Sequence, residues 1–249
     1  MINIFKLGWL EYKKNFCKKG LYIWLGILFL IFFTGLKDVL EKNNNIIIKP
    51  GDIVQVLNSM CGVFFQFILI LNAINILLEE FRYGTGTFLF TGSRSRVQIL
   101  FSKVLSILFL GLTLGLINYF FIMCYAWQLN LDYKYFSRCG SIIFLYFIYA
   151  WVTSNYFLFC SIIFKNRLAS FIAGLFFLYL LSDGIKKIII GLGLPKKFLD
   201  LNPFLAIDEN SFAFFINSDI NFYRFLIMFV LGLIFFILSA LVFNKKDLA

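Results

Sequence analysis

The sequence predicts an all-α integral membrane protein whose 249 residues form a single transmembrane domain, residues 1–249. The chain is 61% apolar and only 14% charged, whereas a soluble domain is roughly 45–50% apolar and 25% charged. The apolar residues gather in long runs that charged residues separate. None of these runs alternates apolar and polar positions, which the strands of an outer-membrane barrel require. We therefore expect helices.

Six apolar segments are the predicted transmembrane helices. A helix that crosses a bilayer needs about 20 residues, because each residue advances the helix by about 1.5 Å. The first and fifth segments are shorter than this, so we expect them to use flanking residues or to be tilted or broken. The six segments are 21–36, 53–78, 104–127, 141–164, 168–182 and 225–243.

The N-terminal segment 1–20 is predicted to contain an amphipathic helix on the inner membrane surface. Its apolar residues recur at helical spacing while its lysines occupy other faces, which is typical of interfacial helices. The apolar set is Ile4, Phe5, Trp9, Tyr12 and Phe16, and the basic set is Lys6, Lys13 and Lys14.

A long loop, 183–224, precedes the last predicted span. It contains an apolar stretch, 185–194, that Lys186 and Lys187 interrupt. The stretch is too short to cross a membrane. We expect a broken, re-entrant or interfacial segment at the outer face, where protein can cover its backbone groups.

The distribution of Lys and Arg predicts that both termini are cytoplasmic. With that orientation the inner segments 1–20, 79–103, 165–167 and 244–249 hold 13 Lys and Arg, against 5 in the short outer loops. Cytoplasmic loops carry the excess of basic residues in membrane proteins. This bias accounts for the net charge of +10, so no nucleic-acid partner is expected.

The composition also argues against an enzyme. The chain has no His and its five Cys show no C-x-x-C spacing, which removes the usual catalytic and metal-binding constellations. No Gly is followed by Lys, so the chain lacks the P-loop that holds ATP phosphates. We predict no catalytic residue, no metal site and no cofactor in this chain.

The stretch between the second and third predicted helices mixes charge, glycine and apolar residues. Glu79 and Glu80 stand near its start, and Arg94 and Arg96 near its end. This order suits a short helix on the membrane surface, with acids at its N-terminus. An ordinary loop whose charges fix the topology explains the residues equally well.

The stretch contains a recognisable order of residues. It begins with Glu80, continues with Gly84, Thr85 and an apolar run, and ends with residues 93–96 and Lys103. This order resembles the cytoplasmic signature of ABC-2 type transporter permeases. In that family the segment docks onto a partner ATPase. The six-span layout and the ending Phe243–Leu248 are also similar to that family.

The resemblance implies a multi-pass subunit of an ABC exporter in the bacterial plasma membrane. It implies an ATPase dimer on separate chains that binds ATP and Mg²⁺, and a second permease half, identical or homologous. The substrate would be hydrophobic or amphipathic, such as a peptide, bacteriocin or drug. The residues expected to couple to the ATPase are Glu79, Glu80, Arg82, Gly84, Thr85, Arg94 and Arg96.

Amides inside the predicted spans are candidates for a substrate path, namely Asn72, Asn75, Asn118 and Asn155. Polar residues within a membrane are rare and often functional, although they also hold helices together. Gly111 and Gly115 allow a close helix approach, within the chain or to a second copy.

Two other function classes remain open. A membrane immunity or scaffold protein could bind its ligand without ATP. An intramembrane enzyme is a distant alternative, because His is absent and the acids of the predicted inner face are scattered along the sequence.

Overall fold

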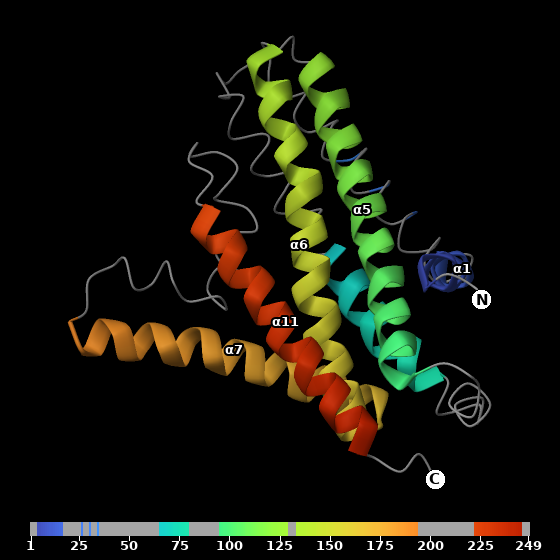
Figure 1. Ribbon diagram of the computed structural model, residues 1–249. Coiled ribbons are helices and arrows are strands. Elements are labelled where there is room, and N and C mark those ends of the chain that lie inside the picture. The colour runs from blue at the N-terminus through green and yellow to red at the C-terminus, as the bar shows by residue number, and fades with distance from the viewer. Residues whose placement is uncertain are drawn as a thin grey trace.

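The computed structural model describes residues 4–16, 26, 30, 34, 65–79, 95–128, 133–193 and 222–245, and within these ranges every regular element is an α-helix. The all-helical prediction is thus confirmed for the described part of the chain. The helices are α1 (Ile4–Phe16), a helix over Phe65–Glu79, α5 (Arg96–Gln128), α6 (Tyr133–Phe164), α7 (Arg167–Gly191) and α11 (Phe222–Lys245) (Figure 1).

Three of these helices are long and apolar enough to cross a membrane. The spanning stretches are Arg96–Cys124, Ile143–Phe164 and Phe225–Asn244. They contain the third, fourth and sixth predicted spans almost entirely. Length and composition of these helices support a membrane protein.

The second and first predicted spans are described only in part. The helix over Phe65–Glu79 covers the second half of the predicted span 53–78. Of the predicted span 21–36, only Gly26, Leu30 and Thr34 are described, and all three are helical.

Two helices begin eight residues earlier than the sequence predicted. Helix α5 begins at Arg96 and α6 at Tyr133, whereas charged residues had placed their starts at 104 and 141. Lys and Arg are good helix formers, and their long stems can lie along apolar surface. The charged residues before each apolar run therefore show where the run begins, but the helix itself begins earlier.

Helix α7 also differs from its prediction. It continues to Gly191, whereas the predicted span ended at 182, so residues 183–191 of the predicted outer loop are helical. The helix ends where Gly193 adopts a φ of 64°, a left-handed conformation that glycine adopts readily. The rest of the predicted outer loop, 194–221, lies outside the described residues.

The contact between α5 and α6 forms the centre of the molecule. A Cβ atom on Gly111 would overlap the Cβ of Ala150, and one on Gly115 would lie 3.1 Å from the Cα of Ile143. Glycine at these two positions lets the helix backbones approach closely. The Gly111 and Gly115 pair therefore serves α5 and α6 within one chain, so the described structure gives it no role in contact with a second copy.

Helix α11 packs beside α6 through aromatic rings. The indole Nε1 of Trp151 donates a hydrogen bond to the Phe229 carbonyl at 3.0 Å, and the Trp151 ring stacks on Phe229 and Phe236. A Cβ on Gly232 would overlap the indole. The ring thus fills the space that this glycine leaves.

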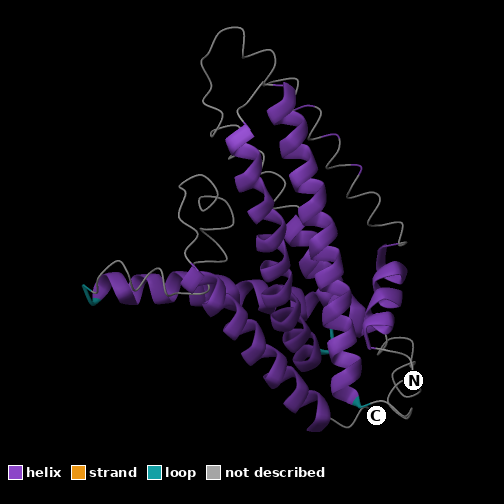
Figure 2. Ribbon diagram, turned by 45° about the horizontal axis from the view of Figure 1, so that its top comes forward, coloured by secondary structure: helices purple, strands orange, loops and turns teal. Residues whose placement is uncertain are grey.

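Helices α1 and α7 lie crosswise to the central pair. Figure 1 looks along α1, whereas α5 runs across the same view. Figures 1 and 2 both show α7 leaving the bundle sideways. The turn into α7 is short, because Lys165 has a φ of 50° and the Asn166 side chain caps the helix by accepting from the backbone N–H groups of Leu168 and Ala169.

We expect Gly111→Ala to lower the free energy of unfolding by about 1–3 kcal/mol, because the added methyl group enters a packed helix contact. Thermal unfolding in mild detergent measures the effect. Gly184→Ala is the matched control, since no described atom lies within 4 Å of a Cβ at Gly184. Equal unfolding temperatures for the two variants would show that the α5–α6 contact tolerates a wider spacing.

Candidate functional site

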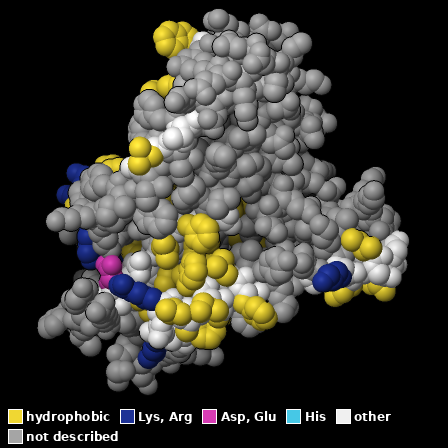
Figure 3. Space-filling view, turned by 180° about the vertical axis from the view of Figure 1, so that it is seen from behind, with side chains coloured by type: hydrophobic (Ala, Val, Ile, Leu, Met, Phe, Trp, Pro, Cys, Tyr) yellow, Lys and Arg dark blue, Asp and Glu magenta, His cyan; other side chains and the backbone are white. Residues whose placement is uncertain are grey.

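Polar contacts between helices gather at one end of the bundle. There α5 begins, α6 turns into α7, and α11 ends. We call this region the polar end and define it by Glu79, Arg96, Arg167 and Asn244. Figure 3 shows Lys and Arg side chains beside a patch of apolar side chains on the rear face of the molecule.

The start of α5 is fixed by a capping box. The backbone N–H of Ser95 donates to Oε1 of Gln98, and the backbone N–H of Gln98 donates to Oγ of Ser95, both at 3.3 Å. These reciprocal bonds satisfy backbone donors that a helix N-terminus leaves without partners. The helix start therefore has a defined position next to the segment 80–94.

Arg96 joins this helix start to the end of α11. Its Nη1 donates to the carbonyl oxygens of Phe243 at 3.1 Å and Asn244 at 3.2 Å. The last carbonyls of a helix lack partners within the helix and carry partial negative charge. Arg96 thus satisfies the C-terminus of α11 while belonging to α5.

Glu79 makes a second contact between helices. Its Oε1 lies 3.7 Å from Nη2 of Arg167, and the two side chains are 21% and 44% exposed. Glu79 is the last described residue of the helix over Phe65–Glu79, whereas Arg167 is the first residue of α7. The ion pair places these two helix ends together at the polar end.

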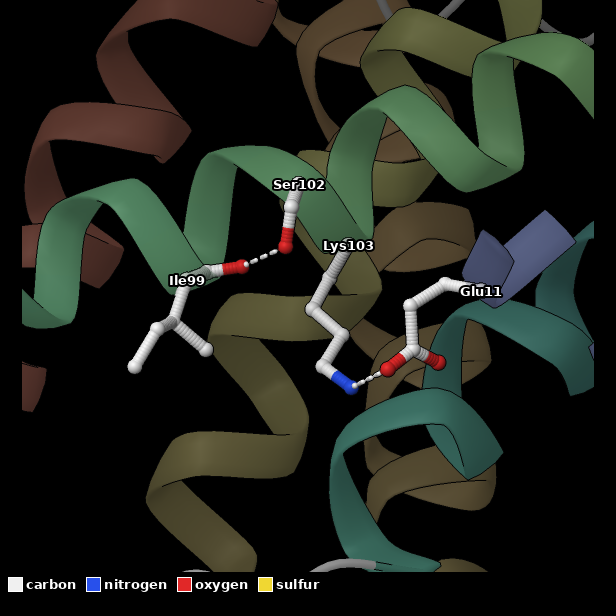
Figure 4. Close-up of polar contacts among 4 residues, drawn as sticks. All are labelled: Glu11, Ile99, Ser102 and Lys103. Carbon is white, nitrogen blue, oxygen red and sulfur yellow. Dashed lines mark hydrogen bonds and ion pairs between the residues drawn. The ribbon is translucent and has the colours of Figure 1, made fainter. Parts of the chain in front are cut away.

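The third contact is an ion pair between α1 and α5. Nζ of Lys103 lies 3.1 Å from Oε1 of Glu11, and the side chains are only 2% and 17% exposed (Figure 4). A buried ammonium is costly unless a charged group and hydrogen bonds compensate it. Glu11 supplies that carboxylate, so α1 is fixed to α5 at this point.

The structure places two of the seven residues predicted to couple to an ATPase. Glu79 and Arg96 lie at the polar end, on either side of the segment 80–94. The others lie outside the described residues, namely Glu80, Arg82, Gly84, Thr85 and Arg94. Lys103, at the end of the predicted coupling segment 79–103, lies inside α5.

The amides predicted to line a substrate path lie on three helices. Asn72 and Asn155 donate to carbonyls of their own helices, those of Ile68 and Trp151, each at 2.8 Å. Asn118 donates to the Tyr146 hydroxyl of α6 at 3.3 Å, so it holds α5 and α6 together. Asn75 is partly buried.

Asn118 and Asn155 are each only 1% exposed. The hydrogen bond from Asn118 to Tyr146 fits the helix-packing alternative, whereas that of Asn155 stays within α6. A role in a substrate path remains a prediction for all four amides.

The sequence did not predict that Glu11 pairs with Lys103 or that Arg167 pairs with Glu79. Neither position shows a local signal, because each partner comes from a distant part of the chain. The start of α5 was detectable, since Ser95 followed three residues later by Gln98 is a capping-box pattern.

The fold and the polar end together define an all-helical membrane protein in which charged residues join helix ends. The chain belongs to the family described as Protein of unknown function (DUF2705), whose model matches residues 42–249. No curated protein matches the chain.

We expect Glu11→Leu to destabilise the protein by about 3–5 kcal/mol, because Lys103 then loses a carboxylate while it stays buried. Lys103→Met should cost less, since Glu11 is the more exposed member of the pair. The double variant should recover most of the loss, because apolar residues of similar volume can replace an ion pair. Unfolding of the four proteins in detergent gives the coupling energy. Additive losses would show that the two side chains act independently.

Proposed function

We propose that this chain is the membrane-spanning subunit of an ATP-driven exporter. In this proposal the chain crosses the bacterial plasma membrane six times, and the fifth crossing is tilted or broken because α7 lies crosswise to α5 and α6. Both termini are cytoplasmic, and the chain works with an ATPase dimer and a second permease half. The substrate class is hydrophobic or amphipathic. The described fold supports the membrane part of this proposal through three helices able to span.

The proposal rests on the contacts that the residues on either side of the segment 80–94 make with other helices. On its N-terminal side Glu79 pairs with Arg167 of α7. On its C-terminal side Arg96 bonds to the last carbonyls of α11. A force applied to the segment by a docked ATPase would therefore reach two helices besides those that the segment joins.

The sequence of the segment supports the same role. It carries the order of residues that resembles the ABC-2 signature, including Glu80, Gly84 with Thr85, and Arg94. The absence of a P-loop sequence in the chain fits a subunit that relies on a separate ATPase.

The polar end also supports the proposed orientation. The described parts of three predicted inner segments, 79–103, 165–167 and 244–249, meet there through the contacts of Glu79, Arg96 and Arg167. Segments that face the same side of a membrane must lie at the same end of the bundle. The excess of basic residues in these segments favours the cytoplasm as that side.

Cysteine labelling from outside the cell tests the orientation. In a Cys-free background we expect Asp208→Cys to react with a membrane-impermeant reagent and Phe88→Cys to react only after the membrane is opened. The reverse pattern, with position 88 labelled and position 208 protected, would contradict the proposed topology.

Coupling is tested by the double variant Glu80→Ala and Arg94→Ala. We expect it to lose co-purification with the partner ATPase and substrate-stimulated ATP hydrolysis, because charge pairs removed from an interface can cost about 2–5 kcal/mol of association. The permease reconstituted alone should show only background hydrolysis. Arg96 is left in place because it caps α11.

The matched control is Glu41→Ala with Lys42→Ala, which removes one acid and one base from a predicted outer loop. This control should keep ATPase binding. If the Glu80 and Arg94 variant also retains binding and hydrolysis, the segment is an ordinary charged loop. In that case a non-transporting immunity or scaffold protein becomes the better interpretation.

A further inference from the structure

Helix α1 has an inward face that packs on α5. Gly8, Tyr12 and Asn15 are buried, and Trp9 packs edge-on against Phe109 of α5 with ring centroids 5.6 Å apart. The ion pair between Glu11 and Lys103 lies on the same side of the helix. These contacts give α1 a fixed rotation about its own axis.

This rotation turns apolar and basic side chains outward together. Phe5, Trp9 and Leu10 are 59%, 44% and 49% exposed. Lys6, Lys13 and Lys14 are also exposed. Lys6, Leu10, Lys13 and Lys14 are spaced three or four positions apart and share one side of the helix, which we call the outward face of α1. Phe5 and Trp9 lie beside this face.

The outward face is positively charged. The sequence of α1 contains three lysines and one acid, Glu11, and the carboxylate of Glu11 is directed to Lys103 of α5. The charged side chains that α1 contributes to its outward face are therefore all lysines.

The ring of Trp9 is partly exposed at the protein surface, and neighbouring side chains fix its position. It stacks on Tyr12 with centroids 5.1 Å apart, and Nζ of Lys13 lies 5.6 Å from the Trp9 ring centroid. Trp is enriched at membrane–water interfaces, and Lys extends its charge from apolar surroundings to the headgroup level. The combination matches the chemistry of a lipid headgroup layer.

The direction of α1 agrees with this chemistry. Helix α1 lies crosswise to α5 (Figure 1), and α5 is a candidate span. If α5 runs through the bilayer, then α1 lies along its surface. Lys103 is seven residues beyond Arg96, which places its backbone about 10 Å along the helix from the start of α5.

We propose that the outward face of α1 binds anionic phospholipid headgroups of the leaflet at the polar end, through Lys6, Lys13 and Lys14. The apolar side chains enter the outer part of that leaflet, and the Glu11–Lys103 pair transfers the resulting position of α1 to α5. This inference does not depend on the exporter proposal, because it concerns only α1, α5 and lipid.

The test uses the full chain in nanodiscs of phosphatidylcholine alone or of phosphatidylcholine mixed with phosphatidylglycerol. Hydrogen exchange of the amides of residues 4–16 reports how often α1 leaves α5. Anionic lipid should slow this exchange, and high salt should remove the difference, because salt screens surface charge. The slowing should be about fivefold for each lysine, which corresponds to about 1 kcal/mol per basic residue near an anionic surface.

The variant with Lys6→Gln, Lys13→Gln and Lys14→Gln should exchange at the same rate in both lipids. Lys165→Gln with Lys187→Gln is the matched control, since both lysines are exposed and lie outside α1. The control should keep the full lipid dependence. Should the triple variant not assemble, the salt titration of the unmodified chain still decides the outcome.

Three results would overturn the proposal. The first is equal exchange of the unmodified chain in both lipids. The second is a lipid dependence that survives in the triple variant or in high salt. The third is protection of α1 that appears only when the ATPase is added, which would make the outward face a protein contact.

Discussion

The close contact between α5 and α6 is the constraint on which the other helices depend. Gly111 and Gly115 bring the two backbones together against Ala150 and Ile143. Helices α1 and α11 both pack on α5, and α7 and α11 both pack on α6. In an apolar solvent helices gain little from burying apolar surface, so close packing and polar contacts must hold them together. A wider α5–α6 spacing would displace each helix that rests on this pair.

Polar contacts complement this packing at one end of the bundle. Arg96 joins α5 to α11, Glu79 joins the helix over Phe65–Glu79 to α7, and Glu11 joins α1 to α5. Each contact satisfies a charge or a helix terminus that would be costly alone in apolar surroundings. The same bonds hold the flanks of the segment 80–94, so stability and the proposed coupling rest on the same residues. Substitutions here need stability measurements before any loss of activity is interpreted.

The sequence predicted the helices better than their ends. Hydropathy located α5, α6 and α11, because the free energy of transferring a long apolar run into the membrane is a sum over neighbouring residues. It placed the starts of α5 and α6 eight residues too late, since charge was taken as a boundary. It also ended the fifth span at 182, although α7 continues to Gly191. For the site, charge and the family resemblance singled out Glu79 and Arg96, but their partners Arg167 and α11 were not predicted.

The sequence by itself determined the helical membrane class, the approximate positions of the three described helices that are able to span, and the amphipathic character of α1. These properties depend on composition and on periodicity over a few turns, which are local. Only the tertiary structure decided that Gly111 and Gly115 face α6, that α7 lies crosswise, and that Glu11 pairs with Lys103. The last two residues are 92 positions apart, and no local pattern in the sequence connects them. Their pairing follows from how α1 docks on α5, because burial leaves the Lys103 ammonium with a strong need for a nearby carboxylate.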